Sequence, residues 1–235
     1  MKIEVWSDYV CPFCYIGKRR LEEALAETGL GEQAEVVFKA FELDPNSPAV
    51  SDMNMEEVLA KKYGTTVAEA KKMTDNVAVQ AQSVGLNYDF ANMTPANTFN
   101  AHRLAKLAEQ EGVGGQVSER LLQAYFVDAE KIGTEDVLLR IAEESGISQD
   151  RAKEVLASDE FATEVKGDIA EAGQIGVQGV PFFVINRKYA ISGAQPAEAF
   201  ADALRKVAEE EGIQPALKVL GAEGEGLCTD DGCDI

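Results

Sequence analysis

Hydrophobic positions in the first 43 residues predict a strand, a helix and a second strand. Residues 2–7 are rich in bulky apolar side chains and stop at a polar pair, as a short buried strand does. From Pro12 the apolar residues recur at helical spacing until Gly29, and residues 35–43 return to a strand pattern. This order of elements favours a right-handed crossover and a parallel sheet.

Residues 44–175 carry helical spacing and helix-end signals almost throughout, so we expect an all-helical insertion there. Thr66, with Glu69 three positions later, predicts a capped helix start, and Pro95 suits the first turn of a helix near Thr94. Further helices are expected from near Asp52 and over residues 117–130, 134–145, 148–157 and 159–172.

Beyond residue 175 the pattern becomes that of a hairpin followed by a helix. Residues 180–185 and 188–191 are strand-like runs around a polar turn, and Pro196 introduces a helical pattern that stops at Gly212. We therefore predict a discontinuous α/β domain of residues 1–43 and 176–212, a helical insertion domain of residues 44–175, and an acidic, glycine-rich tail of residues 213–235.

Composition and charge narrow the class of protein. Of the 235 residues, 46% are hydrophobic and 27% are charged, which is typical of a folded globular chain. The net charge of −19 repels phosphate backbones and anionic lipid headgroups, so we expect neither nucleic acid nor a membrane as a partner. The sequence shows no secretory pattern, and a cytoplasmic protein is expected.

The four cysteines form two local pairs, Cys11 with Cys14 and Cys228 with Cys233. In a reducing cytosol such pairs indicate redox or metal chemistry before structural disulfides. Cys11 and Cys14 enclose Pro12 and Phe13 between a predicted strand and a predicted helix, and this setting is typical of a redox C-x-x-C motif.

Cys11 is the expected nucleophile, because unpaired backbone N–H groups and the helix dipole at a helix start stabilise a thiolate. Cys14, one turn later, can attack the resulting mixed disulfide and release the substrate. An inert thiol pair and a zinc site that uses all four cysteines are the alternatives. The lone His102 gives no conventional metal site, and we expect neither a metal nor a cofactor.

Pro181 follows Val180 at the start of an apolar strand, where its missing N–H is tolerated. A cis bond between them would leave neighbouring backbone groups free to pair with an extended peptide. On these residues alone, an ordinary trans proline is equally compatible with the pattern.

Four segments together resemble the DsbA family of thioredoxin-fold oxidoreductases, and within it the cytosolic FrnE-like branch. They are WSDYVCPFCYIG at 6–17, NTFNAHR at 97–103, GVPFF at 179–183 and ISGAQ at 191–195. The resemblance implies an α/β thioredoxin-like fold with a large all-helical insertion over nearly the whole chain. It also implies that Cys11 attacks, that Cys14 resolves, and that Val180 and Pro181 form a cis-proline loop against them.

The function implied is that of a thiol-disulfide oxidoreductase, a reductase or isomerase acting on disulfide-containing proteins or small thiols. Phe13 brings no charge to hold the Cys11 thiolate, so we expect a weaker oxidant than periplasmic relatives, whose dipeptide usually includes histidine. The alternative is a glutathione-dependent isomerase or transferase of the 2-hydroxychromene-2-carboxylate isomerase or kappa-class type, and those relatives typically carry serine where Cys11 stands. A third class is a peptide-binding protein without catalysis.

Two further features are each compatible with two interpretations. Acidic residues surround Cys228 and Cys233, so these thiols are expected to be sluggish nucleophiles that either reduce a Cys11–Cys14 bridge or have no role. His102 either contributes to a small-molecule pocket or packs between helices.

Overall fold

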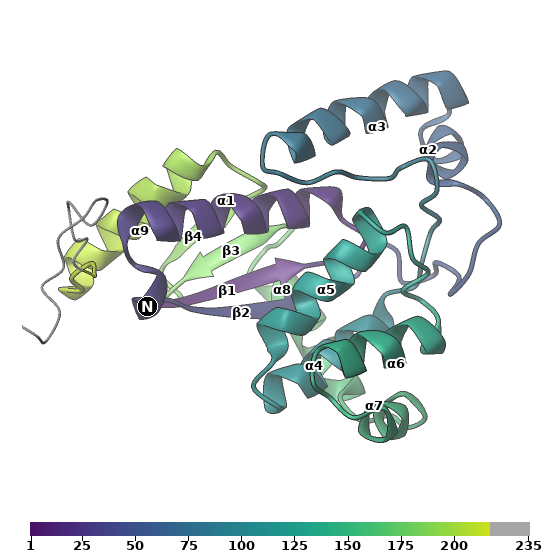
Figure 1. Ribbon diagram of the computed structural model, residues 1–235. Helices are drawn as coiled ribbons and strands as arrows, with labels where there is room; N and C mark the ends of the chain where they lie inside the picture. Colours follow the sequence, from purple (N-terminus) through teal and green to yellow (C-terminus); the bar gives the residue numbers. More distant parts are fainter. Residues whose placement is uncertain (217–235) are drawn as a thin grey trace, which may run out of the picture.

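The computed structural model describes residues 1–216, whose strands form one four-stranded sheet in the order β2-β1-β3-β4 (Figure 1). Strand β1 (Lys2–Ser7) runs parallel to β2 (Glu35–Ala40), with Lys2 opposite Glu35 and Ser7 opposite Ala40. Strand β3 (Phe182–Ile185) is antiparallel to β1, and β4 (Tyr189–Ser192) is antiparallel to β3. The N-terminal strand therefore lies inside the sheet and carries the chain directly to the two cysteines.

Helices cover both faces of this sheet, so the side chains of β1 are buried on both of its faces. Ile3 and Val5 pack with helix α1 (Pro12–Thr28) and helix α9 (Ala197–Glu211) on one face. Trp6, the only tryptophan of the chain, packs with Val184 and helix α8 (Ala162–Gln174) on the other. Its indole N–H donates to the Asp168 carbonyl oxygen at 3.0 Å.

The remaining described helices lie between β2 and α8 in the chain. They are α2 (Met55–Tyr63), α3 (Val67–Gln82), α4 (Phe99–Gln110), α5 (Gly114–Phe126), α6 (Glu135–Glu144) and α7 (Gln149–Leu156). Leu104, Leu121 and Ile141 belong to a core that joins α4, α5 and α6 and that also includes Tyr15 and Ile16 of α1. Helices α2 and α3 form a hairpin beyond the N-terminal end of α1 (Figure 1).

Most predicted elements are present, and several of them have different ends. The strand expected to reach residue 43 stops at Ala40, because the Leu43 N–H turns inward to the carboxylate of Asp8 at 2.7 Å. The helix expected near Thr94 starts at Phe99, since the Thr94 carbonyl oxygen accepts a hydrogen bond from the Tyr125 hydroxyl. The helix expected over 117–130 spans Gly114–Phe126.

The division into an α/β domain and an insertion stays a prediction, and helix α8 from the predicted insertion packs on the sheet. Among the helices of the described residues, none combines the length and the hydropathy that crossing a membrane requires.

Candidate active site

Cys11 and Cys14 lie at the junction between β1 and α1. Cys11 is the N-cap residue of α1 and Pro12 follows in the first turn, as predicted. The Cys11 N–H donates to the Asp8 carbonyl oxygen at 3.0 Å, and the Cys14 N–H to the Cys11 carbonyl oxygen at 3.0 Å. Both are free thiols, with exposed fractions of 4% for Cys11 and 3% for Cys14. Phe13 between them is the exposed residue of the motif, at 37%.

Burial controls the chemistry of Cys14. It raises the pKa of the Cys14 thiol well above its usual value, and the neighbouring Cys11 raises it further. Hydrogen bonds from the Ser7 hydroxyl and the Asp8 backbone N–H act in the opposite direction and lower that pKa. The net result is a residue that stays protonated, and therefore unreactive, until its proton is removed.

The loop before β3 lies against the first cysteine. The Val180–Pro181 peptide bond is cis, and the Cys11 thiol donates to the Val180 carbonyl oxygen at 3.3 Å. Gly17 brings α1 close to this loop, because a Cβ atom at that position would lie 3.0 Å from Pro181 Cγ. The structure thus places Val180 and Pro181 next to Cys11, although they are far from it in the sequence.

His102, in the first turn of α4, packs against the segment that follows β1. It is 3% exposed, with its Nε2 atom 3.0 Å from the Phe41 carbonyl oxygen and 3.5 Å from Asp8 Oδ1. The Tyr9 ring packs against it with 4.8 Å between centroids. His102 therefore connects α4 to the residues just before the cysteines, and its environment fits both packing and a chemical role.

Asp8 and Ser7 are site residues that the sequence reasoning missed. Asp8 is 1% exposed, and its Oδ1 atom has no hydrogen-bond partner in the described part of the chain. Ser7 is buried at the end of β1 beside Cys14. The available signal was two polar residues at the end of the predicted strand, three and four positions before Cys11, where the strand brings them close to the C-x-x-C motif.

Tyr88 is a second omission, and it comes from the segment between α3 and α4. Its hydroxyl donates to the Pro12 carbonyl oxygen at 2.8 Å, and its ring stacks on Phe126 with 4.7 Å between centroids. Burial raises the pKa of Tyr88, and the nearby Tyr15 and cysteine groups add to the rise. Tyr88 thus covers the start of α1, and no motif around it in the sequence indicates this.

Cys228 and Cys233 lie outside the described residues, so the role of this pair stays a prediction. Within residues 1–216, no three His, Cys, Asp or Glu side chains gather in a way that could hold a metal ion.

Comparison with known proteins agrees with this geometry. The DSBA-like thioredoxin domain family matches residues 2–205. The crystal structure of probable DsbA oxidoreductase SCO1869 from Streptomyces coelicolor is 37% identical, with a TM-score of 0.84, and the match covers 100% of this chain and 99% of that one. The predicted thioredoxin-like fold with a helical insertion is thereby confirmed.

Two more relatives differ in what they add. Uncharacterized protein YwbO of Bacillus subtilis (strain 168) is 29% identical over 205 residues, which are 86% of this chain and 94% of YwbO. The structure of cytosolic disulfide reductase DsbM from Pseudomonas aeruginosa with GSH is 14% identical, with a TM-score of 0.63, over 89% of this chain and 100% of that one. The second likeness shows a shared fold alone.

Proposed function

Since this chain belongs to the DsbA-like thioredoxin domain family, we propose that it is a thiol-disulfide oxidoreductase of the FrnE-like branch, with Cys11 and Cys14 as its redox centre. The observation that carries the proposal is the arrangement of the two thiols. Cys11 caps α1 beside the Val180 carbonyl oxygen, and Cys14 is buried one turn behind it. This arrangement suits one attacking and one resolving sulfur.

The reaction proceeds by two exchanges. The Cys11 thiolate attacks one sulfur of a substrate disulfide, so that a mixed disulfide forms and the other substrate sulfur leaves as a thiolate. Cys14 then attacks Cys11, the Cys11–Cys14 bond forms, and the second substrate sulfur leaves. The substrate disulfide gains two electrons and becomes two thiols. A further thiol compound must later reduce the Cys11–Cys14 disulfide by the same kind of exchange.

Val180 and Pro181 would bind the substrate chain beside Cys11. A backbone oxygen and a strand start at this position offer the hydrogen-bonding edge that an extended peptide needs. The partners proposed are disulfide-containing proteins or small thiols, in the cytoplasm. The fold is shared with cytosolic disulfide reductase DsbM, whose structure was determined with GSH, and we extend that location and that kind of thiol partner to this chain as part of the proposal.

Trapping tests the assignment of the two cysteines. In a full-length chain with Cys228→Ser and Cys233→Ser, adding Cys14→Ser should leave insulin chains or glutathione covalently attached to Cys11. The reason is that the resolving sulfur is missing. Mass spectrometry of the trapped species measures it, and Cys11→Ser is the matched control that should trap nothing.

The same variants separate the rival function. A glutathione-dependent isomerase needs a hydroxyl or thiol at position 11 only to orient the glutathione sulfur. Turnover of an isomerisable substrate that survives Cys11→Ser, together with failure to trap, would replace the oxidoreductase with that rival.

A further inference from the structure

Tyr88 joins the helical part of the molecule to the backbone of the redox motif. It lies between α3 and α4, and its hydroxyl donates to the Pro12 carbonyl oxygen at 2.8 Å. A carbonyl oxygen has two lone pairs, so it can accept this bond in addition to a bond of the α1 ladder. The hydroxyl therefore acts on the peptide group between Pro12 and Phe13.

Aromatic packing fixes the position of this hydroxyl. The Tyr88 ring stacks on Phe126 of α5 with 4.7 Å between centroids. It also meets Phe90 edge-on at 5.7 Å and lies 6.2 Å from the Tyr15 ring of α1. Burial raises the pKa of Tyr88, so the hydroxyl keeps its proton and acts as a donor. A ring held on several sides is preorganised toward Pro12.

Ionisation changes what the Cys11 sulfur needs. As a thiol it donates to the Val180 carbonyl oxygen at 3.3 Å, and it does not cap a backbone N–H of α1. A thiolate has no hydrogen to donate and needs donors instead. An N-cap side chain reaches the N–H of the second or third residue of its helix, which here are Phe13 and Cys14.

Of these two donors, the Phe13 N–H is the free one. The Cys14 N–H already donates to the Cys11 carbonyl oxygen at 3.0 Å, whereas the Phe13 N–H has no acceptor among residues 1–216. This N–H belongs to the peptide group whose oxygen Tyr88 binds. A hydrogen bond to the oxygen polarises the group and makes its N–H a stronger donor. Tyr88 thus strengthens the donor within reach of Cys11.

The titratable neighbours of Tyr88 are occupied by other contacts. Besides the two cysteines, Tyr15 and Arg19 act on it most strongly. The Tyr15 hydroxyl donates to the Glu119 carboxylate at 2.6 Å, and the Arg19 guanidinium pairs with the same carboxylate. Neither side chain is therefore free to hold a charge on Cys11.

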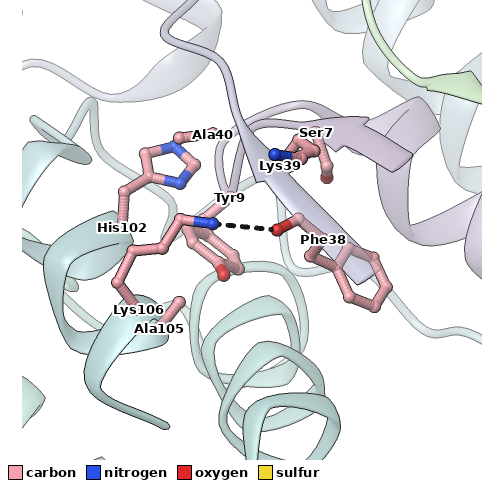
Figure 2. A pocket seen from close by; sticks show the side chains of 8 residues that line it. All are labelled: Ser7, Tyr9, Phe38, Lys39, Ala40, His102, Ala105 and Lys106. Carbon is pink, nitrogen blue, oxygen red and sulfur yellow. Dashed lines mark hydrogen bonds between the residues drawn. The ribbon is translucent and has the colours of Figure 1, made fainter. Parts of the chain in front are cut away.

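His102 is also engaged away from the start of α1. Its Nε2 atom lies 3.0 Å from the Phe41 carbonyl oxygen, and its ring packs against Tyr9 (Figure 2). In the described part of the chain, no basic side chain hydrogen-bonds to Cys11. The backbone donors of the helix start are thus left to hold its negative charge.

We propose that Tyr88 is a positioning residue for the attacking cysteine: its hydrogen bond to Pro12 strengthens the Phe13 N–H, and that N–H holds the Cys11 thiolate. The inference rests on the proposed function. In this step Cys11 gives its proton to water or buffer, and no bond to carbon or sulfur changes. A thiolate that is better held also favours the reduced protein over the disulfide, so Tyr88 makes the protein a stronger oxidant.

Two equilibria measure this effect in full-length protein with Cys228→Ser and Cys233→Ser. The first is ionisation of Cys11, followed by thiolate absorbance and by the pH profile of iodoacetamide alkylation, with the alkylated residue located by mass spectrometry. The second is formation of the Cys11–Cys14 disulfide against glutathione disulfide, at a pH where Cys11 is ionised.

Tyr88→Phe keeps the ring and removes the donor. It is expected to lower the ionisation constant of Cys11 about twofold to threefold and to raise the disulfide constant by about the same factor. The effect is modest because polarisation changes a charge-assisted hydrogen bond by a fraction of its strength. The matched control is Tyr125→Phe, which removes a hydroxyl bonded to the Thr94 carbonyl oxygen in the same aromatic cluster. It should leave both constants at their parental values.

Fluorotyrosine placed at position 88 has a more acidic hydroxyl and is the stronger donor. Both constants should therefore shift in the direction opposite to Tyr88→Phe, which a purely structural role does not produce. This protein carries the test if Tyr88→Phe does not fold.

Unchanged constants in both position-88 proteins overturn the role of Tyr88, and so do shifts of the same sign in the two. An equal shift in Tyr125→Phe also overturns it, because the cluster and not the bond to Pro12 would then be responsible. A parent in which glutathione disulfide never joins Cys11 to Cys14 overturns the proposed function instead.

Discussion

Gly17 sets how closely α1 approaches the segment that faces Cys11. A methyl group at this position would lie 3.0 Å from Pro181 Cγ and 3.1 Å from the Phe183 ring. Contacts this short force the neighbours to move, and both neighbours belong to the packed loop and strand beside the thiols. The missing side chain of Gly17 therefore determines the position of Pro181 relative to the motif.

We predict that Gly17→Ala destabilises the protein by about 1–2 kcal/mol, although alanine is ordinarily the better helix former. Urea unfolding measures the change. Gly167→Ala in α8 is the control, because a Cβ atom there would meet no atom within 4 Å other than its own helix backbone, and it should be neutral or stabilising. Equal effects in the two variants would show that helix propensity, and not the approach to Pro181, governs position 17.

The residue-scale predictions from sequence succeeded where a pattern is local. The position of Cys11 at a helix start follows from a strand, a proline and helical spacing within a few residues. The contacts of Tyr88 and of His102 join segments far apart in the chain, and single-sequence patterns contain no such information. For the same reason the cis state of Val180–Pro181 stayed open until the structure was known.

At the scale of elements, Asp168 joins α8 to β2 and α4. It accepts hydrogen bonds from Lys39 at 2.8 Å and from the Ala40 N–H at 3.1 Å, and it lies 2.8 Å from Lys106. Burial alone would raise the pKa of Asp168, but the hydrogen bonds from Lys106 and Lys39 outweigh it and hold the pKa below its usual value. The sheet and the helical part are thus fastened at one buried carboxylate.

Asp168→Asn is expected to cost about 2–4 kcal/mol of unfolding free energy at neutral pH, because two lysines lose their buried partner. The folded-state pKa is depressed, so this contribution is complete above the unfolded pKa of about 3.9 and is lost as pH falls through the folded value. Denaturant unfolding at neutral and acidic pH should therefore show a gap that narrows in acid.

Asp202→Asn, which breaks an exposed pair with Arg205 on α9, is the control and should cost under about 1 kcal/mol. A loss at Asp168 that is independent of pH would mean that shape and not charge fastens α8.

Element ends explain which structural predictions held. The capping box at Thr66 and Glu69 is present, since both of its hydrogen bonds close within four residues. Thr94 and Pro95 carry a similar signal, but Thr94 is engaged by Tyr125 from α5, and the helix begins later at Phe99. A tertiary contact thus overrides a local start signal.

At the scale of the whole molecule, the net charge of −19 bears on which small disulfides arrive quickly. We predict that oxidation by glutathione disulfide, an anion, speeds up with added salt, whereas oxidation by the cation cystamine slows down. Stopped-flow fluorescence or thiol counting at several ionic strengths measures both rates. Hydroxyethyl disulfide, which is uncharged, should respond little, and a common salt response of all three would exclude steering by charge.

Trp6 lies in the layer between the sheet and α8, with the Arg187 guanidinium 5.7 Å above its ring. As the chain has no other indole, all of its tryptophan emission originates from this one layer. Trp6 is therefore an intrinsic fluorescent probe near the end of β1, the strand that leads to Cys11 and Cys14. Separation of α8 from the sheet can be followed by light without attaching a dye.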